Sequence, residues 1–244
     1  MRRDESGNVR LLRTCRNGQA KLNGYLEDYA FFADGLLHLY ECSFDSRWLE
    51  LAIELTKSML ACFWDEENGG FFATSNDHEK LIQRPKDWDD NATPSGNSVA
   101  LDVLLRLAVL TGEDMYRQRA ARVLRRLGST LEKHPYGFAR CLSALDFYLS
   151  SPKEIAIFGK QNDPASLELL RSIYSLYLPN KIVVQADGPT ASGLIPLLEG
   201  RTLRAGKPTA YVCENFACKE PTNDSVVLLL QLQSDRLGRA SPTV

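Results

Sequence analysis

Three carboxylate side chains stand where the sequence predicts that long helices begin, and they are the candidates for acid–base chemistry. Glu27 and Asp28 follow a Gly-Tyr pair, and Asp90 precedes the segment Thr93-Pro94-Ser95. Paired carboxylates can supply the acid and the base that cleavage of a glycosidic bond or an epimerising proton transfer requires. We therefore predict Glu27, Asp28 and Asp90 as catalytic or ligand-orienting residues. A structural role stays open, because acids favour the first turn of any helix and Asp90 can belong to a turn and an N-cap.

Polar and aromatic residues near these carboxylates are the candidates for ligand binding. They are Tyr25, Tyr29, Trp64, Trp88, Ser95, Asn97 and Tyr136. Groups at helix N-termini can bind hydroxylated ligands, and aromatic rings can stack on sugar rings, although core packing is the default role of any one aromatic residue. Gly96 and Asn97 are poor helix formers at a helix start, so something other than propensity placed them there. We expect the clusters around Tyr25, Ser95 and Tyr136 to converge on one rim.

A pair of cysteines, Cys213 and Cys218, is the second candidate site. Four intervening residues can close a turn, so the pair can be a redox couple, half of a metal site, or two structural thiols. The chain has three histidines and no second close cysteine pair, which argues against a closed zinc site. We predict no metal and no cofactor. The other cysteines are scattered, and Cys42, Cys62 and Cys141 fit the core, which favours a reducing, cytoplasmic setting.

A helical hairpin occurs twice, 68 residues apart, and predicts a stack of helix pairs. Leu36-Leu37 recurs as Leu104-Leu105, and Ala52 recurs as Ala120. Such pairs bury their apolar faces against each other. The first helices of three hairpins are predicted at 24–42, 95–111 and 136–149, and the second helices at 46–63, 113–129 and 222–233.

A β-α-β unit is predicted to interrupt the third hairpin. Apolar runs at 154–159 and 181–185 are typical of strands, and 164–177 of a helix with Asp163 as N-cap and Pro164 in its first turn. The sequence between the first two hairpins predicts a β-turn or a short β-hairpin at Asn68-Gly69-Gly70. The predicted domains are a polar N-terminal segment at 1–22, helical hairpins at 23–150, an α/β insertion with the Cys-x4-Cys segment at 151–221, and a final barrel helix with a tail at 222–244.

Composition excludes some partners. The chain has 244 residues, of which 44% are hydrophobic and 25% charged, and its net charge is −2. This charge gives no electrostatic reason to expect nucleic acid or an anionic membrane as a partner. No segment approaches the roughly 20 apolar residues that span a bilayer, and no apolar stretch follows the basic N-terminus, so we expect no membrane span and no secretory signal.

Four motifs in order resemble one family. They are Tyr25-Leu26-Glu27-Asp28-Tyr29-Ala30, the stretch 63–72 with Trp64-Asp65-Glu66-Glu67-Asn68-Gly69-Gly70, the stretch 86–98 ending in Pro94-Ser95-Gly96-Asn97-Ser98, and Tyr211-Val212-Cys213-Glu214-Asn215-Phe216-Ala217-Cys218. The resemblance is to the spermatogenesis-associated protein family and its bacterial relatives. It covers nearly all of residues 9–233. Members of that family are much longer than this chain, which resembles their C-terminal third.

The resemblance implies a fold more firmly than a reaction. Family members fuse a thioredoxin-like domain to an (α/α)6 barrel similar to those of N-acylglucosamine 2-epimerases and six-hairpin glycosidases. The fold implied here is mainly α, a partial (α/α)6 toroid of about three helical hairpins with a small β-α-β insertion. Half a toroid leaves flanks uncovered, so we expect an exposed apolar side on the first helix, at Tyr29, Phe32, Leu36 and Leu37.

Two classes of function follow. The first is a carbohydrate-active, glycosidase- or epimerase-like domain that binds or processes a sugar-like ligand at the rim of the inner helices. The alternative is a non-catalytic scaffold or binding module that works with a thioredoxin-like domain or a missing N-terminal half, with Cys213 and Cys218 as a possible redox client. An inactive truncated fragment is a third reading.

Overall fold

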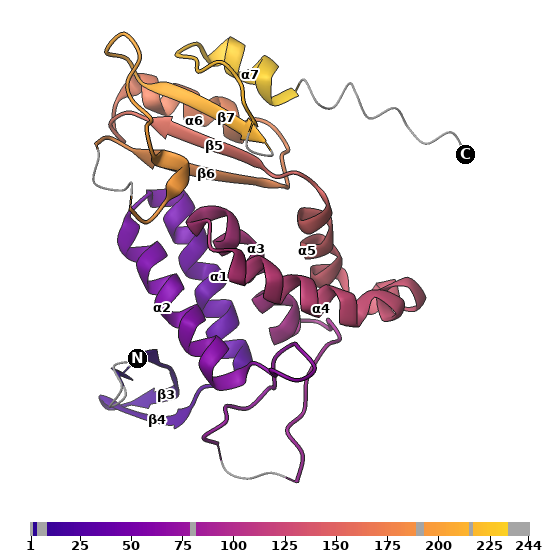
Figure 1. Ribbon diagram of the computed structural model, residues 1–244. Helices are drawn as coiled ribbons and strands as arrows, with labels where there is room; N and C mark the ends of the chain where they lie inside the picture. The colour runs from indigo at the N-terminus through magenta and orange to yellow at the C-terminus, as the bar shows by residue number, and fades with distance from the viewer. Residues whose placement is uncertain (1, 4–8, 79–81, 189–192, 215–216, 234–244) are drawn as a thin grey trace. The chain divides into compact units, whose positions relative to one another are not determined.

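The computed structural model describes residues 2–3, 9–78, 82–188, 193–214 and 217–233. The chain divides into two compact units (Figure 1). Unit 1 comprises 1–108 and 113–148, and unit 2 comprises 109–112 and 149–244. Helices dominate unit 1, and unit 2 is built around a small sheet. The mainly helical class predicted from the sequence is confirmed, while a toroid remains a prediction.

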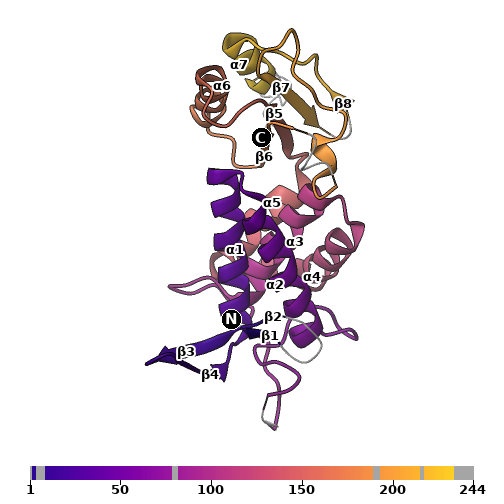
Figure 2. The same ribbon diagram turned by 90° about the vertical axis from the view of Figure 1, so that its left-hand side faces the viewer.

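Two helical hairpins and a fifth helix occur where the sequence places them. They are α1 (Leu26–Ser43), α2 (Ser46–Phe63), α3 (Gly96–Thr111), α4 (Asp114–Lys133) and α5 (Ala139–Leu149), which follows the short helix η1 (Pro135–Gly137). A tight loop joins α1 to α2. Phe44 adopts a left-handed conformation with φ of 52°, and the Asp45 side chain accepts a hydrogen bond from the Arg47 N–H at the start of α2. Helices α1 and α2 lie side by side in both ribbon views (Figures 1 and 2).

The apolar side of α1 is covered, which corrects the expectation of an open flank there. Tyr29, Leu36 and Leu37 are at most 1% exposed, and only Phe32 of the four named residues is open, at 42%. The Tyr29 ring packs edge-on against Phe63 of α2, with centroids 5.0 Å apart. The expectation failed because the core of unit 1 closes on this stripe within the chain itself.

Ion pairs join α1, α3 and α5. The Arg140 guanidinium donates to Asp34 at 3.0 Å and to Asp102 at 2.6 Å, and Arg106 pairs with Glu41 at 2.8 Å. Burial raises the pKa of Asp102, and the positive charges of Arg140 and Arg106 oppose this rise. These three helices are therefore fixed by charged side chains as well as by apolar packing.

The N-terminal segment forms hairpins that the sequence analysis missed. The strands are β1 (Arg2–Arg3), β2 (Val9–Arg10), β3 (Leu12–Arg16) and β4 (Gln19–Asn23), paired antiparallel as β1 with β2 and β3 with β4. Asn17-Gly18 forms the turn between β3 and β4, with positive φ at both residues, as a two-residue hairpin turn requires. The Leu11 N–H donates to the buried Tyr29 hydroxyl at 3.0 Å and so ties the segment to α1.

The linker between the two helical hairpins contains the predicted turn. Trp64 forms an antiparallel bridge with Phe71, and Gly69 and Gly70 between them have φ of 73° and 77°. The Trp64 and Phe71 rings pack edge-on at 5.1 Å. Of the two predicted forms, the short hairpin is confirmed, because the Asp65 N–H donates to the Gly70 carbonyl beside the Trp64–Phe71 bridge.

We expect Gly70→Ala to destabilise unit 1 by about 2–4 kcal/mol. A Cβ atom at Gly70 would lie 2.2 Å from the Trp88 ring, and the positive φ adds strain. Gly35→Ala on α1 is the matched control. A Cβ atom at this position would meet nothing within 4 Å, and alanine favours helix more than glycine does. Urea unfolding of both variants tests this. Equal midpoints would show that Trp88 gives way at little cost.

Unit 2 contains the predicted β-α-β unit. Strand β5 (Lys153–Phe158) runs parallel to β6 (Lys181–Ala186), and α6 (Pro164–Tyr174) connects them. Asp163 accepts a hydrogen bond from the Ala165 N–H as N-cap of α6, as the sequence predicts. The short helix η3 (Pro196–Leu198) precedes β7 (Thr209–Glu214) and β8 (Ala217–Cys218), and the sheet order is β6-β5-β7-β8.

The last helix belongs to unit 2, which corrects its expected role in the third hairpin. Helix α7 (Ser225–Gln233) packs against α6 and β7 (Figures 1 and 2). Its buried Leu228 and Leu232 supply the apolar contact, and the Asp224 side chain accepts the N–H of Val226 at the start of the helix. A short apolar stripe can pack on any apolar surface, so the sequence pattern could not indicate which element α7 packs against. The predicted tail at 234–244 lies outside the described residues.

Candidate functional site

The predicted clusters around Tyr25 and Ser95 line one cavity in unit 1, which we call the rim pocket. Its volume is about 470 Å³. The N-terminal ends of α1 and α3 and the linker that precedes α3 form its wall. The lining residues are Arg13, Tyr25, Leu26, Glu27, Ala73, Thr74, Pro85, Asp87, Asp89, Asn91, Thr93, Pro94, Ser95 and Gly96.

On the α1 side, Tyr25 and Glu27 line the rim pocket, and Asp28 holds the helix start behind them. Asp28 accepts a hydrogen bond from the Tyr25 N–H at 2.8 Å and so stabilises the first turn of the helix. The carboxylate of Glu27 is half exposed and pairs with Arg13 of β3 at 2.9 Å. The Arg13 guanidinium also lies 4.6 Å from the centre of the Tyr25 ring. One cation therefore orients both the carboxylate and the ring.

The α3 side explains the unusual residues at the start of that helix. Ser95 Oγ accepts the Ser98 N–H at 3.1 Å and caps α3. A Cβ atom at Gly96 would lie 3.0 Å from the Leu26 side chain and 3.2 Å from the Glu27 backbone nitrogen, so glycine permits the close approach of the two helix starts. The poor helix formers noted in the sequence thus serve packing around the pocket.

Asn97 is buried and holds the linker in place. Its Oδ1 accepts the Phe71 N–H at 2.8 Å, and its Nδ2 donates to the carbonyls of Phe71 and Asp87 at 2.9 Å. The side-chain amide therefore joins two parts of the linker that are far apart in sequence. It does not line the rim pocket, and its contacts give it a positioning role there.

Asp90 connects the second cluster to the third. Its carboxylate accepts the N–H groups of Ser95 at 2.8 Å, Arg140 at 2.8 Å and Cys141 at 3.3 Å, so it satisfies donors at the starts of both α3 and α5. Burial, together with the charge of Asp90, raises the pKa of the Cys141 thiol to about 12. These contacts make Asp90 a capping residue for two helices.

The other predicted ligand-binding residues do not line the rim pocket as the structure describes it. Tyr29 is buried in the core, which corrects its assignment to a ligand site, and Tyr136 is 99% exposed on η1. Trp88 packs on Gly70. Trp64 is buried in the turn of the linker, where its indole N–H donates to Glu66 at 3.1 Å.

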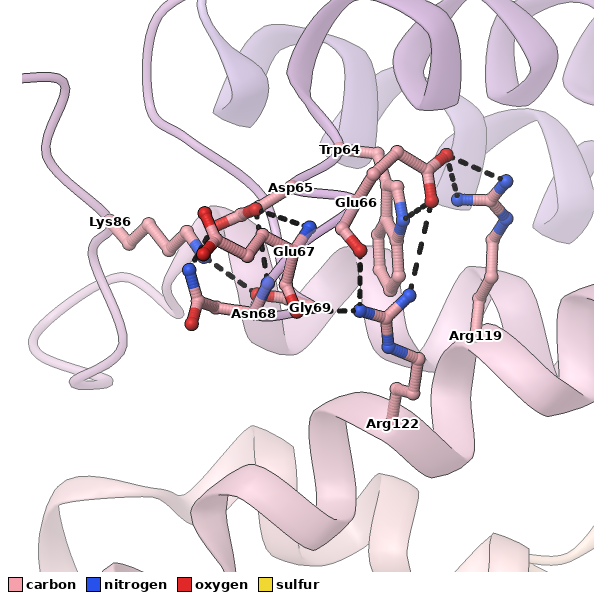
Figure 3. Close-up of polar contacts among 9 residues, drawn as sticks. All are labelled: Trp64, Asp65, Glu66, Glu67, Asn68, Gly69, Lys86, Arg119 and Arg122. Atoms are coloured by element: carbon pink, nitrogen blue, oxygen red, sulfur yellow. Dashed lines mark hydrogen bonds and ion pairs between the residues drawn. The ribbon is translucent and has the colours of Figure 1, made fainter.

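The turn after α2 is a polar cluster that braces the linker (Figure 3). Asp65 accepts the N–H groups of Glu67 and Asn68 and pairs with Lys86 at 2.6 Å. Burial raises the pKa of Asp65, but the Lys86 ammonium and the hydrogen bonds from the turn outweigh it and hold that pKa well below its ordinary value. The Asp65–Lys86 ion pair thus ties the turn to the linker, and side chains of α4 bind the turn from its other side.

Two arginines of α4 attach the turn to the helical core. Arg119 pairs with the Glu66 carboxylate at 3.1 Å, and Arg122 donates to the carbonyls of Glu66 and Glu67 at 2.7 and 3.0 Å. Both guanidinium groups also lie near the Trp64 ring, at 4.8 and 5.5 Å from its centre. These contacts hold the aromatic motif at 63–72 against α4, and they leave Trp64 8% exposed.

Several residues that line the pocket were not among the predicted binding residues. Arg13 arrives through the β3–β4 hairpin, which the Asn17-Gly18 pair could have revealed. Asp87, Asp89, Asn91 and Thr93 lie in the linker and line the pocket beside Ser95. They occupy every second position, which is typical of an extended chain with one side turned to a cavity. This spacing could have identified them from the sequence.

A second cavity of about 540 Å³ lies on the neighbouring side of α1. It is lined by Leu11, Leu12, Arg13, Glu27, Asp28, Phe31 and Phe32. Glu27 and Arg13 belong to both cavities, so their ion pair stands at the boundary between them. Of the three predicted carboxylates, Glu27 and Asp28 thus reach a cavity wall, whereas Asp90 is held by helix starts.

The cysteine pair lies in unit 2. Cys213 on β7 and Cys218 on β8 are directly opposite each other in the sheet and are joined by a disulfide bond, with Asn215 and Phe216 between them outside the described residues. Cys62 and Cys141 are buried as expected, whereas Cys42 is exposed, which corrects its assignment to the core.

The described residues contain no group of three or more histidine, cysteine or acidic side chains placed to hold a metal ion. Within the same part of the chain, none of the helices is both long enough and apolar enough to cross a membrane.

Comparison with known proteins finds relatives over most of the chain. The human relative is 36% identical over 227 residues, covering 88% of this chain, and the mouse relative is 35% identical over the same length. These relatives are spermatogenesis-associated protein 20. The similarity supports the family indicated by the four motifs, although no family model matches the chain. A Caenorhabditis elegans relative, the uncharacterized protein B0495.5, is 25% identical over 212 residues. The chain spans 29% of the length of human spermatogenesis-associated protein 20.

Proposed function

We propose that unit 1 is a carbohydrate-active domain and that its rim pocket binds a sugar-like ligand. The observation that carries the proposal is that the clusters around Tyr25 and Ser95 line one cavity of about 470 Å³. Its wall combines carboxylates, an amide, hydroxyls and one aromatic ring. A cavity of this size, with a few convergent polar groups, is typical of small-molecule sites.

Glu27 is the residue that we propose acts on the ligand. Its carboxylate lies at the pocket wall and is oriented by Arg13, so it can accept a hydrogen bond from a sugar hydroxyl or serve as the acid or base of a glycosidase- or epimerase-like step. Asp87 and Asp89 supply further exposed carboxylates on the linker side. Asp28 and Asp90 position the helix starts on which the pocket depends.

We expect Glu27→Gln to weaken sugar binding about tenfold. The substitution keeps the shape of the side chain and removes its charge, and a hydrogen bond to a charged group contributes about 1.5–3 kcal/mol. The measurement is saturation-transfer NMR of the purified chain, titrated with monosaccharides and short oligosaccharides that include N-acetylated sugars. The bound sugars are then tested for hydrolysis or for a change of configuration.

Glu50→Gln is the matched control, because Glu50 is an exposed glutamate on α2 outside the pocket lining. It should bind sugars as the native chain does. If no sugar in the panel binds, or if both variants bind equally well, the assignment of this pocket to carbohydrate is wrong. Circular dichroism of each variant separates loss of binding from loss of fold.

A further inference from the structure

One arginine side chain touches both sulfur atoms of the disulfide in unit 2. The Nη2 atom of Arg201 lies 3.2 Å from Cys213 Sγ and 3.2 Å from Cys218 Sγ. A neutral disulfide gains little from a full positive charge at this distance, whereas a thiolate gains much. Cationic neighbours are the usual means by which proteins lower the pKa of a cysteine. The contact therefore favours the reduced, ionised state of the pair.

The guanidinium is held in this position by its own segment. Arg201 Nε donates to the Leu197 carbonyl at 3.3 Å, and the guanidinium lies 4.7 Å from the centre of the Tyr211 ring. The Tyr211 hydroxyl in turn donates to the carbonyl of Thr202 at 2.7 Å. Tyr211 and Cys213 are two residues apart on β7, so ring and sulfur share one face of the sheet. The β7 strand and the contacts of Arg201 with Leu197 and Tyr211 thus hold the guanidinium next to the disulfide.

The two sulfurs differ in access. Cys218 is exposed on the short edge strand β8, whereas Cys213 is 2% exposed. Glu154 of β5 stands directly opposite Cys213 in the sheet. Burial raises the pKa of Glu154, and the positive charge of Arg201 opposes this rise. Glu154 and Arg201 are therefore charged groups beside the buried sulfur, whereas the sulfur of Cys218 is open to an incoming thiol.

We propose that Cys213 and Cys218 form a thiol–disulfide exchange site that accepts electrons from a dithiol, with Cys218 as the attacked sulfur and Arg201 stabilising the thiolates. This site is independent of the sugar site proposed for unit 1. Its partner class is a protein or small molecule that carries two neighbouring thiols.

The exchange balances in two displacements. A thiolate of the dithiol attacks Cys218 Sγ, the bond between the two cysteine sulfurs breaks, and Cys213 leaves as a thiolate beside Arg201. The second thiolate of the dithiol then attacks the other dithiol sulfur, which is bonded to Cys218 Sγ in the mixed disulfide. Cys218 leaves as a thiolate, which also lies beside Arg201. The dithiol becomes a disulfide, and each proton that it loses passes to solvent while the released cysteine stays a thiolate, or to that cysteine when it is protonated. A leaving thiol of lower pKa departs faster, which is the contribution of Arg201.

The test is the rate at which dithiothreitol reduces the disulfide in the folded chain at pH 7. Samples are quenched, alkylated and analysed by peptide mass spectrometry, so that the four remaining cysteines do not contribute. We expect Arg201→Gln to slow the reduction roughly three- to tenfold. Arg201→Lys, which keeps the charge, should retain most of the native rate.

Arg204→Gln is the matched control. It removes the same charge three residues away, from a side chain that pairs with the exposed Glu220. Its rate should stay within about twofold of the native chain, because a charge without contact to sulfur is screened by solvent. Equal rates for the Arg201→Gln and Arg204→Gln variants would overturn the role of Arg201.

Single-cysteine variants test the direction of attack. In Cys213→Ser the remaining Cys218 thiol should react with a disulfide reagent at least about tenfold faster than the Cys213 thiol in Cys218→Ser, because only Cys218 is exposed. Reversal of that order would overturn the assignment of Cys218. A disulfide that dithiothreitol reduces only after the chain unfolds would overturn the exchange site as a whole.

Discussion

Replacing Asp90 by alanine should lower the free energy of unfolding of unit 1 by about 3 kcal/mol. The carboxylate accepts N–H groups at the starts of α3 and α5, and no other described group takes its place at those donors. The loss corresponds to a fall in melting temperature on the order of 10 °C for a domain of this size. Thermal unfolding followed by circular dichroism measures it directly.

Two variants sharpen this expectation. Asp89→Ala removes the neighbouring carboxylate, which is exposed, and should change stability by less than about 0.5 kcal/mol. Asp90→Asn keeps an oxygen acceptor and should recover roughly half of the loss. If the Asp90→Ala and Asp89→Ala variants have the same melting temperature, the hydrogen bonds of Asp90 to the starts of α3 and α5 do not stabilise unit 1. A catalytic role for Asp90 would then be favoured.

Replacing Asp65 by alanine should have a similarly large effect, also about 3 kcal/mol. Asp65 and Lys86 are each only 11% exposed at their side chains, so the change leaves an ammonium group with little solvent and removes the acceptor of two backbone N–H groups. Glu67→Gln in the same turn is the control, because Glu67 is exposed and contributes only its backbone to the cluster. Urea unfolding at pH 7 compares the two variants.

The contribution of Asp65 should depend on pH in a defined direction. Its pKa is lower in the folded chain than the unfolded value of about 3.9, so its stabilisation is fully present above that value and is lost as the pH falls below about 4. The stability difference between the native chain and Asp65→Ala should therefore shrink between pH 6 and pH 3. A double-mutant cycle with Lys86→Met should give a coupling of about 1–3 kcal/mol. A difference that grows in acid would falsify the ion pair as its source.

Helices were predictable where they are because their apolar residues recur at three- and four-residue steps and their ends carry turn residues. The repeat located α1 to α4, and the Asp163-Pro164 pair located the start of α6. The partner of α7 was not predictable. Leu228 and Leu232 require an apolar surface, but nothing in their spacing distinguishes α6 from a helix of unit 1.

The candidate site was predictable in place more than in detail. Residues at helix starts meet where those helices meet, which is why Tyr25 and Ser95 share a cavity. The role of each polar residue depends on which donors surround it, and sequence does not show this. The side chains of Asp90 and Asn97 form hydrogen bonds with backbone groups, whereas Glu27 keeps a half-exposed carboxylate. In the sequence, all three were equally plausible as binding or catalytic residues.

The hydrogen bonds by which Asn97 and Asp90 hold the linker affect the thermodynamics of ligand binding. The stretch from Asp87 to Ser95 carries several groups of the pocket wall, and contacts within the chain hold its backbone at Asp87, Asp90 and Ser95. Binding then has little conformational entropy left to remove from this wall. Association should resemble entry into a rigid receptor, with a rate that is linear in ligand concentration and a modest heat-capacity change. Even weak hydrogen bonds to a small ligand would therefore contribute to affinity almost undiminished.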